Sequence, residues 1–219
     1  ELAVNLSIND NILYIEHGSS IMKGINPKNI SKKKKTKNIS NKKFFYNQVT
    51  VHIAGDKRIN MKIFNNGRIQ MTGINKNEQG QHSIRILINE LTRLPDDIKM
   101  TIFDECEIHQ VGSIETVLIN SDFDIFFEIN REALHQLIVD NGYCSSYEPC
   151  TYPGVNIKYY HNTVNNNFGI CECETPCNGK GKDNTCKKIT VAVFKSGKII
   201  ITGGRNKDHI NTAYRFITS

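Results

Sequence analysis

The sequence predicts an α+β fold made of two similar repeats, because one fifteen-residue segment occurs twice. Residues 59–73 (INMKIFNNGRIQMTG) align without a gap with residues 189–203 (ITVAVFKSGKIIITG), 130 positions later. Apolar residues alternate along both copies, and a helical pattern follows each one. A repeat of this length predicts two structurally related halves.

Each copy has the pattern of a β-hairpin. Ile59, Met61 and Ile63 alternate with polar residues, and Gly67 suits the tight turn that follows; the later copy has Ile189, Val191, Val193 and Gly197 at these positions. Beyond the turn, the second strand places Ile69 and Met71, or Ile199 and Ile201, on the buried face. The opposite face then carries Arg68, Gln70, Thr72 and, in the later copy, Lys198, Ile200 and Thr202.

The segment after each hairpin predicts an amphipathic helix that covers one face of the sheet. Its apolar residues are spaced by three, four and seven: Ile84, Leu87, Ile88 and Leu91 in the first half, and Ile210, Ala213, Tyr214 and Ile217 in the second. Nothing in the sequence is left to cover the other face, where Phe64 and Phe194 occupy matching positions. These rings either face water or mark a binding surface, and their duplication favours binding.

The remaining elements follow the same order in both halves. Residues 132–142 predict a helix behind an Asn130 cap, and residues 1–11, which align with them at an offset of 131, predict another. Strands are expected at residues 12–17, 44–53, 99–108 and 115–129. We therefore expect repeats at residues 1–99 and 100–219. The chain opens with Glu1 and no methionine, so the first repeat is expected to lack its first strand and a segment before it.

Two insertions interrupt the repeats. Residues 27–43 are rich in lysine and predict a solvated loop, with a DNA-binding arm as the alternative. Residues 164–188 are polar and contain Cys171, Cys173, Cys177 and Cys186. Four thiolates can bind zinc, although the C-x-C-x3-C-x8-C spacing differs from paired C-x2-C motifs. Unligated thiols and a disulfide are the alternatives.

Composition narrows the classes of partner. The net charge of +6 over 219 residues is compatible with an anionic partner. No apolar run approaches the roughly 20 residues that a membrane-spanning helix needs. The seven cysteines are unevenly placed, which favours a reducing compartment over a disulfide framework.

One set of motifs in the second half is specific. It comprises Tyr147-Glu148-Pro149, then Tyr152-Pro153-Gly154, then Phe194, Ser196-Gly197-Lys198 and Thr202-Gly203. This pattern resembles the second repeat of the TATA-box-binding protein family; the first half resembles the family through Phe64, Gly67, Arg68, Thr72 and Gly73. The resemblance implies a curved antiparallel saddle with helices on its convex face. The insertions are similar to divergent members in large DNA viruses, which implies action in the nucleus, a cytoplasmic virus factory or the virion.

The resemblance also implies a function: a general transcription initiation factor, not an enzyme, that binds and bends A·T-rich promoter DNA through the minor groove. Phe64, Phe194 and Tyr152 match apolar wedges, and the fourth wedge is near Met22 or Phe45. Thr72, Thr202, Asn120 and Ile200 match groove contacts, with Gln70 in place of a small aliphatic residue. Arg58, Lys158 and Lys188 match phosphate contacts, Arg68 and Lys198 complete the implied DNA surface, and His52 replaces an arginine. Glu148 matches the surface that meets transcription factor IIB and, through it, the RNA polymerase machinery.

Two other functions compete with this one. An enzyme on the same fold would use Asp122, Asp124 and Glu128, which we expect on one strand face but without a partner histidine or a metal-ligand spacing. A scaffold that kept the fold and lost DNA binding would explain Gln70, His52 and Tyr152.

Overall fold

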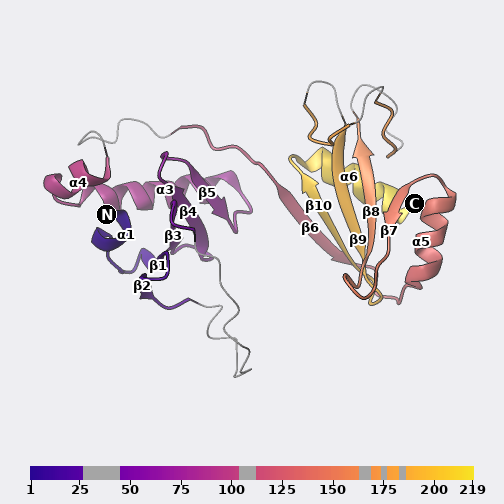
Figure 1. The fold of residues 1–219 in the computed structure, drawn as a ribbon, viewed down its shortest axis with the longest axis horizontal. Helices are drawn as coiled ribbons and strands as arrows, with labels where there is room; N and C mark the ends of the chain where they lie inside the picture. The colour runs from indigo at the N-terminus through magenta and orange to yellow at the C-terminus, as the bar shows by residue number, and fades with distance from the viewer. Residues whose placement is uncertain (27–44, 104–111, 163–168, 174–176, 183–185) are drawn as a thin grey trace. The chain divides into compact units, whose positions relative to one another are not determined.

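The computed structural model describes residues 1–26, 45–103, 112–162, 169–173, 177–182 and 186–219 (Figure 1). The lysine run at 32–43 lies outside these residues, as do parts of the cysteine-rich insertion. The described chain forms two compact units, Glu1–Ile114 and Glu115–Ser219. No helix among the described residues is long and apolar enough to cross a membrane.

The first unit is built on a five-stranded antiparallel sheet with the order β2-β1-β3-β4-β5. Its strands are β1 (Ile12–His17), β2 (Ile21–Gly24), β3 (Gln48–Ile53), β4 (Ile59–Phe64) and β5 (Ile69–Thr72). Helix α3 (Asn77–Thr92) packs Ile84, Leu87 and Leu91 into the core formed with the sheet. Two shorter helices, α1 (Leu2–Asn5) and α4 (Asp96–Ile102), also belong to the described part of the unit.

The second unit also has a five-stranded antiparallel sheet, with the order β6-β10-β9-β8-β7; β6 pairs with β10, whereas among the described residues β5 has only β4 as a neighbour. Its strands are β6 (Ile119–Asp124), β7 (Cys144–Ser146), β8 (Val155–His161), β9 (Lys187–Val193) and β10 (Lys198–Gly204). Helix α6 (Lys207–Thr218) contacts β6, β8, β9 and β10, and α5 (Arg131–Asp140) contacts β7 and β8. The α+β prediction of two repeats with antiparallel sheets and helices is confirmed.

The duplicated hairpins close in the same way. The amide of Phe64 donates to the carbonyl of Arg68 over 2.9 Å, and the amide of Phe194 donates to the carbonyl of Lys198 over the same distance. Gly67 and Gly197 have φ angles of 76° and 83°, which residues with a Cβ atom rarely adopt. The glycines that the sequence places at these turns are therefore required by the backbone.

The helix expected at residues 1–11 is limited to the single turn of α1, so this prediction is largely wrong. Leu6 is already extended, with φ −70° and ψ 133°, and beyond it Asn9 Oδ1 accepts hydrogen bonds from the amides of Asn11 and Ile12, each at 2.8 Å. Such a side-chain turn competes with helical hydrogen bonding. The ammonium of Lys23 binds the carbonyls of Val4 and Leu6, which have no helical partner.

The strand expected at residues 99–108 is also wrong where it is described, since α4 covers residues up to Ile102. Asp96 and Asp97 lie in the first turn of α4. Acidic side chains there stabilise a helix, because they interact favourably with the positive end of its dipole. Residues 104–108 lie outside the described residues. The strand expected over 115–129 is shorter, Ile119–Asp124, because the chain turns after Asp124, whose carboxylate accepts the amide of Phe126. The helix expected behind Asn130 is confirmed, with Asn130 Oδ1 accepting from Ala133 N at 3.1 Å.

Candidate nucleic-acid interface

Each sheet has one face packed against its core and another that we call the open face. In the second unit, the core face carries Ile157, Val191 and Ile201, all buried. Because neighbouring side chains alternate along a strand, the open face carries Asn120 and Asp122 of β6, Lys198, Ile200 and Thr202 of β10, Lys188, Thr190 and Ala192 of β9, and Asn156, Lys158 and Tyr160 of β8. Six of the residues predicted to contact DNA, Asn120, Lys158, Lys188, Lys198, Ile200 and Thr202, share this surface.

A polar row crosses the open face of the second unit. Thr202 pairs with Asn120 on one side and with Thr190 on the other, and its hydroxyl donates to Asn120 Oδ1. Thr190 in turn accepts a hydrogen bond from Lys158 Nζ at 3.0 Å. Burial, followed by repulsion from nearby Lys188, lowers the pKa of the Lys158 ammonium. The row therefore ends in two neighbouring cations.

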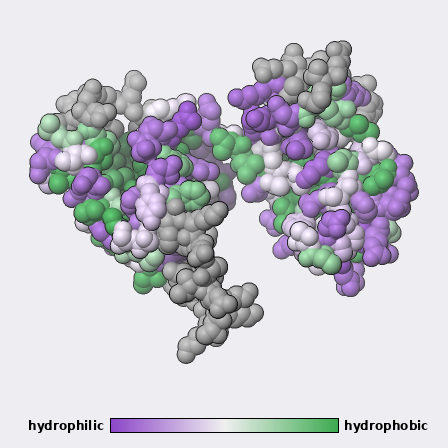
Figure 2. Space-filling model, in the orientation of Figure 1, coloured by the Kyte–Doolittle hydropathy of each residue, from purple (hydrophilic) through white to green (hydrophobic). Residues whose placement is uncertain are grey.

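Next to this row the face is apolar at its centre and acidic at one edge. Ile200 pairs with Ala192 of β9 and with Asp122 of β6, and Lys198 pairs with Asp124. In the view of Figure 2, hydrophilic and hydrophobic residues are interspersed over the visible surface of the second unit. A surface of this kind suits a polar partner with apolar contact at few points.

The two residues of the second unit that were predicted to act as wedges lie together. The rings of Tyr152 and Phe194 have centroids 5.7 Å apart and are inclined by 59°. Gly154 supports both rings, because a Cβ atom there would lie 2.9 Å from Tyr152 Cε1 and 3.2 Å from Phe194 Cε1. The carbonyl of Glu148 accepts the amides of Thr151 and Tyr152, so the exposed Glu148 belongs to the turn that positions this pair.

The first unit repeats this layout with different chemistry. Thr72 pairs with Asn60, and Gln70 pairs with Lys62, all on the open face. Phe64 is half-buried at the end of β4, as Phe194 is beyond β9, and Arg68 is exposed in the turn. Lys62 occupies the place of Ala192 and was missed by the sequence analysis, although the alternation of Met61 and Ile63 already assigned it to this face.

Arg58 and His52 differ in their exposure to solvent. Arg58 is exposed just before β4, as Lys188 is just before Ile189, and its Nη1 donates to the carbonyl of Ile25 at 3.0 Å. His52 is buried, with its ring centroid 4.9 Å from that of Tyr14 and its Nδ1 3.5 Å from Arg58 Nη1. His52 can therefore position Arg58 but is not itself presented to a ligand.

The strand ladder places Tyr46 at the position of the first unit that corresponds to Tyr152. Val49 pairs with Ile63 in the first unit, and Val155 pairs with Val193 in the second. Counting three residues back from each valine gives Tyr46 and Tyr152. Tyr46 is 67% exposed, whereas the residues expected from the sequence, Met22 and Phe45, occupy other positions in the sheet and its approach. The shared Tyr-x-x-Val spacing was the available signal.

The three carboxylates of the rival enzyme function do not converge. Asp122 and Asp124 alternate along β6 and are exposed. Glu128 lies beyond the end of this strand, and its carboxylate is 3.7 Å from Lys195 Nζ. The expectation that all three share a strand face is therefore wrong for Glu128.

The four cysteines of the second insertion come together. Their Sγ atoms all lie within 4.8 Å of one another, and the Sγ atoms of Cys173 and Cys186 are 3.5 Å apart. Tetrahedral coordination with bonds of about 2.3 Å requires sulfur atoms roughly 3.8 Å apart, so this cluster can hold a metal ion. The amide of Gly179 donates to Cys177 Sγ at 3.3 Å, and the amide of the Asn162 side chain donates to Cys186 Sγ at 3.6 Å. Burial is the main cause that raises the pKa of Cys186 to about 12, so without a metal this thiol keeps its proton.

Comparison with known proteins agrees with these features. Residues 114–219 match the family model described as transcription factor TFIID (or TATA-binding protein, TBP). The chain is 30% identical over 200 residues to a TATA-box-binding protein-like protein of Acanthamoeba polyphaga mimivirus, covering 84% of this chain and 49% of that protein. It is 26% identical over 153 residues to a TATA-box-binding protein of Methanothermococcus thermolithotrophicus, covering 70% and 62%. The chain thus spans about half the length of the first relative and less than two thirds of the second.

A solved structure, Methanococcus jannaschii TBP, aligns over 94% of both chains with a TM-score of 0.49 and 17% identity. The match to the family model covers the second repeat, and the similarity to the mimivirus protein covers most of the chain. The second unit therefore belongs to the TATA-binding protein family, and the rest of the chain resembles the same family through the mimivirus relative.

Proposed function

We propose that this chain is a TATA-box-binding-protein-like transcription initiation factor that binds A·T-rich duplex DNA through the minor groove and bends it. The open face of the second unit is the observation that carries the proposal. It presents Asn120, Thr202 and Ile200 between the cationic side with Lys158 and Lys188 and the acidic β6 edge, with the Tyr152–Phe194 pair at one end.

Such a face suits the chemistry of the minor groove. A·T pairs present only acceptors there, whereas G·C pairs add an amino group that projects into the groove. Short side chains such as Thr202 and Asn120 can donate to these acceptors, and Ile200 can pack where no amino group intrudes. Aromatic side chains at the end of the face can insert between base steps, which kinks the duplex.

Cations around the open face would bind the phosphates. Lys158, Lys188 and Lys198 in the second unit, and Arg58 and Arg68 in the first, supply this charge. Asp122 and Asp124 oppose it at the β6 edge, so we expect phosphate contacts to be concentrated away from that strand. Phosphate contacts position the protein without selecting sequence, and they make binding depend on salt.

Competition between duplexes tests the proposal. Binding to an A·T-rich duplex should survive an excess of a G·C-rich duplex of equal length, and log K should fall linearly with log salt concentration. Thr202→Val and Asn120→Ala should each weaken binding, while Asn211→Ala, an exposed change on α6, should not. Equal affinity for both duplexes would contradict minor-groove selection, and a lack of binding at low salt would favour a scaffold without DNA binding.

We also propose that Glu148 contributes to recruitment of a transcription factor IIB-like protein and, through it, RNA polymerase. The support is its exposure in the turn that positions Tyr152. Glu148→Arg should abolish binding of such a factor to the DNA complex and leave DNA binding intact. Glu132→Arg, an exposed change on α5, is the matched control; equal loss by both variants would contradict a specific contact.

The metal that the cysteine cluster would hold is, we propose, a structural zinc ion. Cys171, Cys173, Cys177 and Cys186 would be its ligands, and a closed set of four thiolates is typical of structural sites. Bound zinc supplies a cross-link for a polar segment that has little core of its own. Purified protein should contain about one zinc per chain, lost in Cys177→Ser/Cys186→Ser and kept in Cys144→Ser/Cys150→Ser, which changes two exposed thiols. Metal-free wild-type protein would reject zinc.

A further inference from the structure

The cysteine cluster is joined to the DNA-facing sheet by backbone hydrogen bonds. The amide of Lys188 in β9 donates to the carbonyl of Gly179 at 2.9 Å, two residues after Cys177. The amide of Tyr160 in β8 donates to the carbonyl of Gly169 at 2.8 Å, two residues before Cys171. The segments that supply the cysteines therefore hold the ends of two neighbouring strands.

The two residues held in this way are partners on the open face. Tyr160 lies directly opposite Lys188 in the β8–β9 ladder. Burial, followed by the nearby thiols of Cys144, Cys171, Cys177 and Cys186, raises the pKa of the Tyr160 hydroxyl. The cluster is thus close to the cationic edge where Lys158 and Lys188 lie.

Gly179 packs directly on the stem of Lys188. A Cβ atom at Gly179 would lie 2.5 Å from Lys188 Cβ, and its φ angle is 67°, so glycine is required on both grounds. The next residue, Lys180, pairs with Lys187, and the amide of Gly181 donates to the carbonyl of Cys186 at 3.1 Å. Residues 179–181 thus extend the sheet beside the start of β9, and Cys177 and Cys186 flank this extension.

We propose that metal binding at Cys171, Cys173, Cys177 and Cys186 is coupled to DNA binding, because the metal-bound segment holds Lys188 at the edge of the open face. The coupling rests on the proposed DNA-binding function and assigns Cys177 and Gly179 as positioning residues for a phosphate contact. Without the metal, residues 179–181 would have to become ordered when DNA binds. Ordering a backbone costs conformational entropy, so DNA binding would be weaker. Coupling is reciprocal, so DNA should also tighten metal binding.

A thermodynamic cycle that combines zinc removal with the Lys188→Ala substitution tests the coupling. DNA affinity is measured against salt for zinc-loaded and chelator-treated protein, each with and without Lys188→Ala. We expect removal of zinc to weaken binding by roughly fivefold or more and to reduce the salt slope by about 0.9, the equivalent of one phosphate contact. Lys188→Ala should then have a large effect in the zinc-loaded protein and little effect in the zinc-free protein.

Lys198→Ala is the matched control, because Lys198 lies on the same open face, on β10, and pairs with Asp124 rather than with the insertion. Its effect should be the same with and without zinc. Cys177→Ser/Cys186→Ser should reproduce the chelated state, and zinc added back to chelated wild-type protein should restore binding, which guards against a variant that fails to fold.

Hydrogen exchange gives a second result that needs no DNA. The amides of Lys188 and Tyr160 should lose protection when zinc is removed, while amides in the centre of β9, such as that of Val191, should keep it. Equal protection in both states, or equal effects of Lys188→Ala in both states, would overturn the coupling alone. Failure of zinc-loaded protein to bind any duplex would contradict the proposed function, and the coupling with it.

Discussion

Tyr152 and Phe194 form a tilted aromatic pair, with ring centroids 5.7 Å apart, at the end of the second open face. They are 42 residues apart in the sequence and come together because β8 pairs with β9. Gly154 lies against both rings and has no room for a side chain. The pair therefore packs on Gly154, and both rings are partly exposed.

Replacement of Phe194 by alanine should reduce DNA bending and affinity with little loss of stability, and Phe64→Ala should do the same in the first unit. Both rings lie on open faces and are only half-buried. Phe216→Ala is the control: that ring is also half-buried, but it packs on Tyr143 and on the buried Tyr159 of the core, so its loss should cost more, up to about 3 kcal/mol. Thermal melts distinguish the two cases. If Phe194→Ala lowers the melting temperature as much as Phe216→Ala does, the Phe194 ring belongs to the core.

Tyr46 should act as the wedge of the first unit that corresponds to Tyr152. Tyr46→Ala is expected to reduce bending of the duplex, whereas Met22→Ala, an exposed change on β2, should leave it unchanged. The Tyr46 ring also packs edge-on against His17, with centroids 6.3 Å apart, so Tyr46→Phe should keep this support and most of the bending. The reverse order, with Met22 critical and Tyr46 neutral, would contradict the register argument.

The two halves should differ in the way they contact the groove. Lys62 and Gln70 stand opposite each other where the second unit has Ala192 and Ile200. Lys62→Ala should reduce the salt slope of binding by about 0.9, and Gln70→Ile should leave the slope unchanged while altering preference between A·T and G·C pairs. An unchanged slope for Lys62→Ala would show that this ammonium does not reach the DNA.

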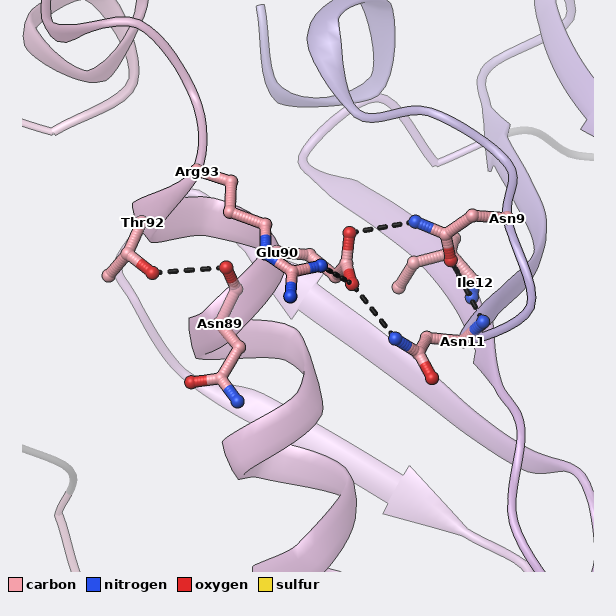
Figure 3. A network of polar contacts seen from close by, with 7 residues as sticks. All are labelled: Asn9, Asn11, Ile12, Asn89, Glu90, Thr92 and Arg93. Atoms are coloured by element: carbon pink, nitrogen blue, oxygen red, sulfur yellow. Dashed lines mark hydrogen bonds and ion pairs between the residues drawn. The ribbon is translucent and has the colours of Figure 1, made fainter.

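A buried carboxylate network should make the first unit sensitive to acid (Figure 3). Glu90 of α3 is 8% exposed and accepts hydrogen bonds from Asn9 at 2.7 Å and from Asn11 at 3.0 Å, and it pairs with Arg93 at 3.0 Å. The hydrogen bond from Asn11 is the main cause that lowers the Glu90 pKa below its ordinary value of 4.5. The folded state therefore favours the ionised form, so its contribution is fully present above pH 4.5 and is lost as the pH falls through the lower folded value.

Glu90→Gln should lower the free energy of unfolding by about 1 to 3 kcal/mol at neutral pH, because the new amide group faces a donor. The difference from wild type should shrink in melts below pH 4.5. Glu78→Gln, an exposed change at the start of the same helix, is the control and should show a smaller effect. A loss for Glu90→Gln that is independent of pH would contradict a role for the ionised carboxylate.

The sequence predicted those elements whose information is local and repeated. Ile59, Met61 and Gly67 specify a strand and a tight turn without reference to distant residues, and the second copy confirms the assignment. The helix behind Asn130 was found because its cap and its apolar spacing lie within a few residues. Lys62 could have been found in the same way, since its neighbours fix its face.

Other features depend on pairings between distant residues. The alternation of Leu2, Val4 and Leu6 and the offset to residues 132–142 give no sign that Asn9 would form a side-chain turn beside Glu90 of α3. Tyr46 follows an insertion that interrupts the alignment, so the short Tyr-x-x-Val spacing that it shares with Tyr152 becomes decisive only with the β3–β4 register. The meeting of Cys171 and Cys186 beside Lys188 likewise depends on the fold of the insertion.

Bending of a doubly labelled A·T-rich duplex tests the central claim most directly. Fluorescence energy transfer between dyes at the two ends should rise on saturation with wild-type protein, because insertion at the aromatic positions shortens the end-to-end distance. The rise should be smaller for Tyr152→Ala/Phe194→Ala at equal saturation and absent with a G·C-rich duplex of the same length. An unchanged end-to-end distance at full occupancy of the A·T-rich duplex would contradict the proposed mode of binding.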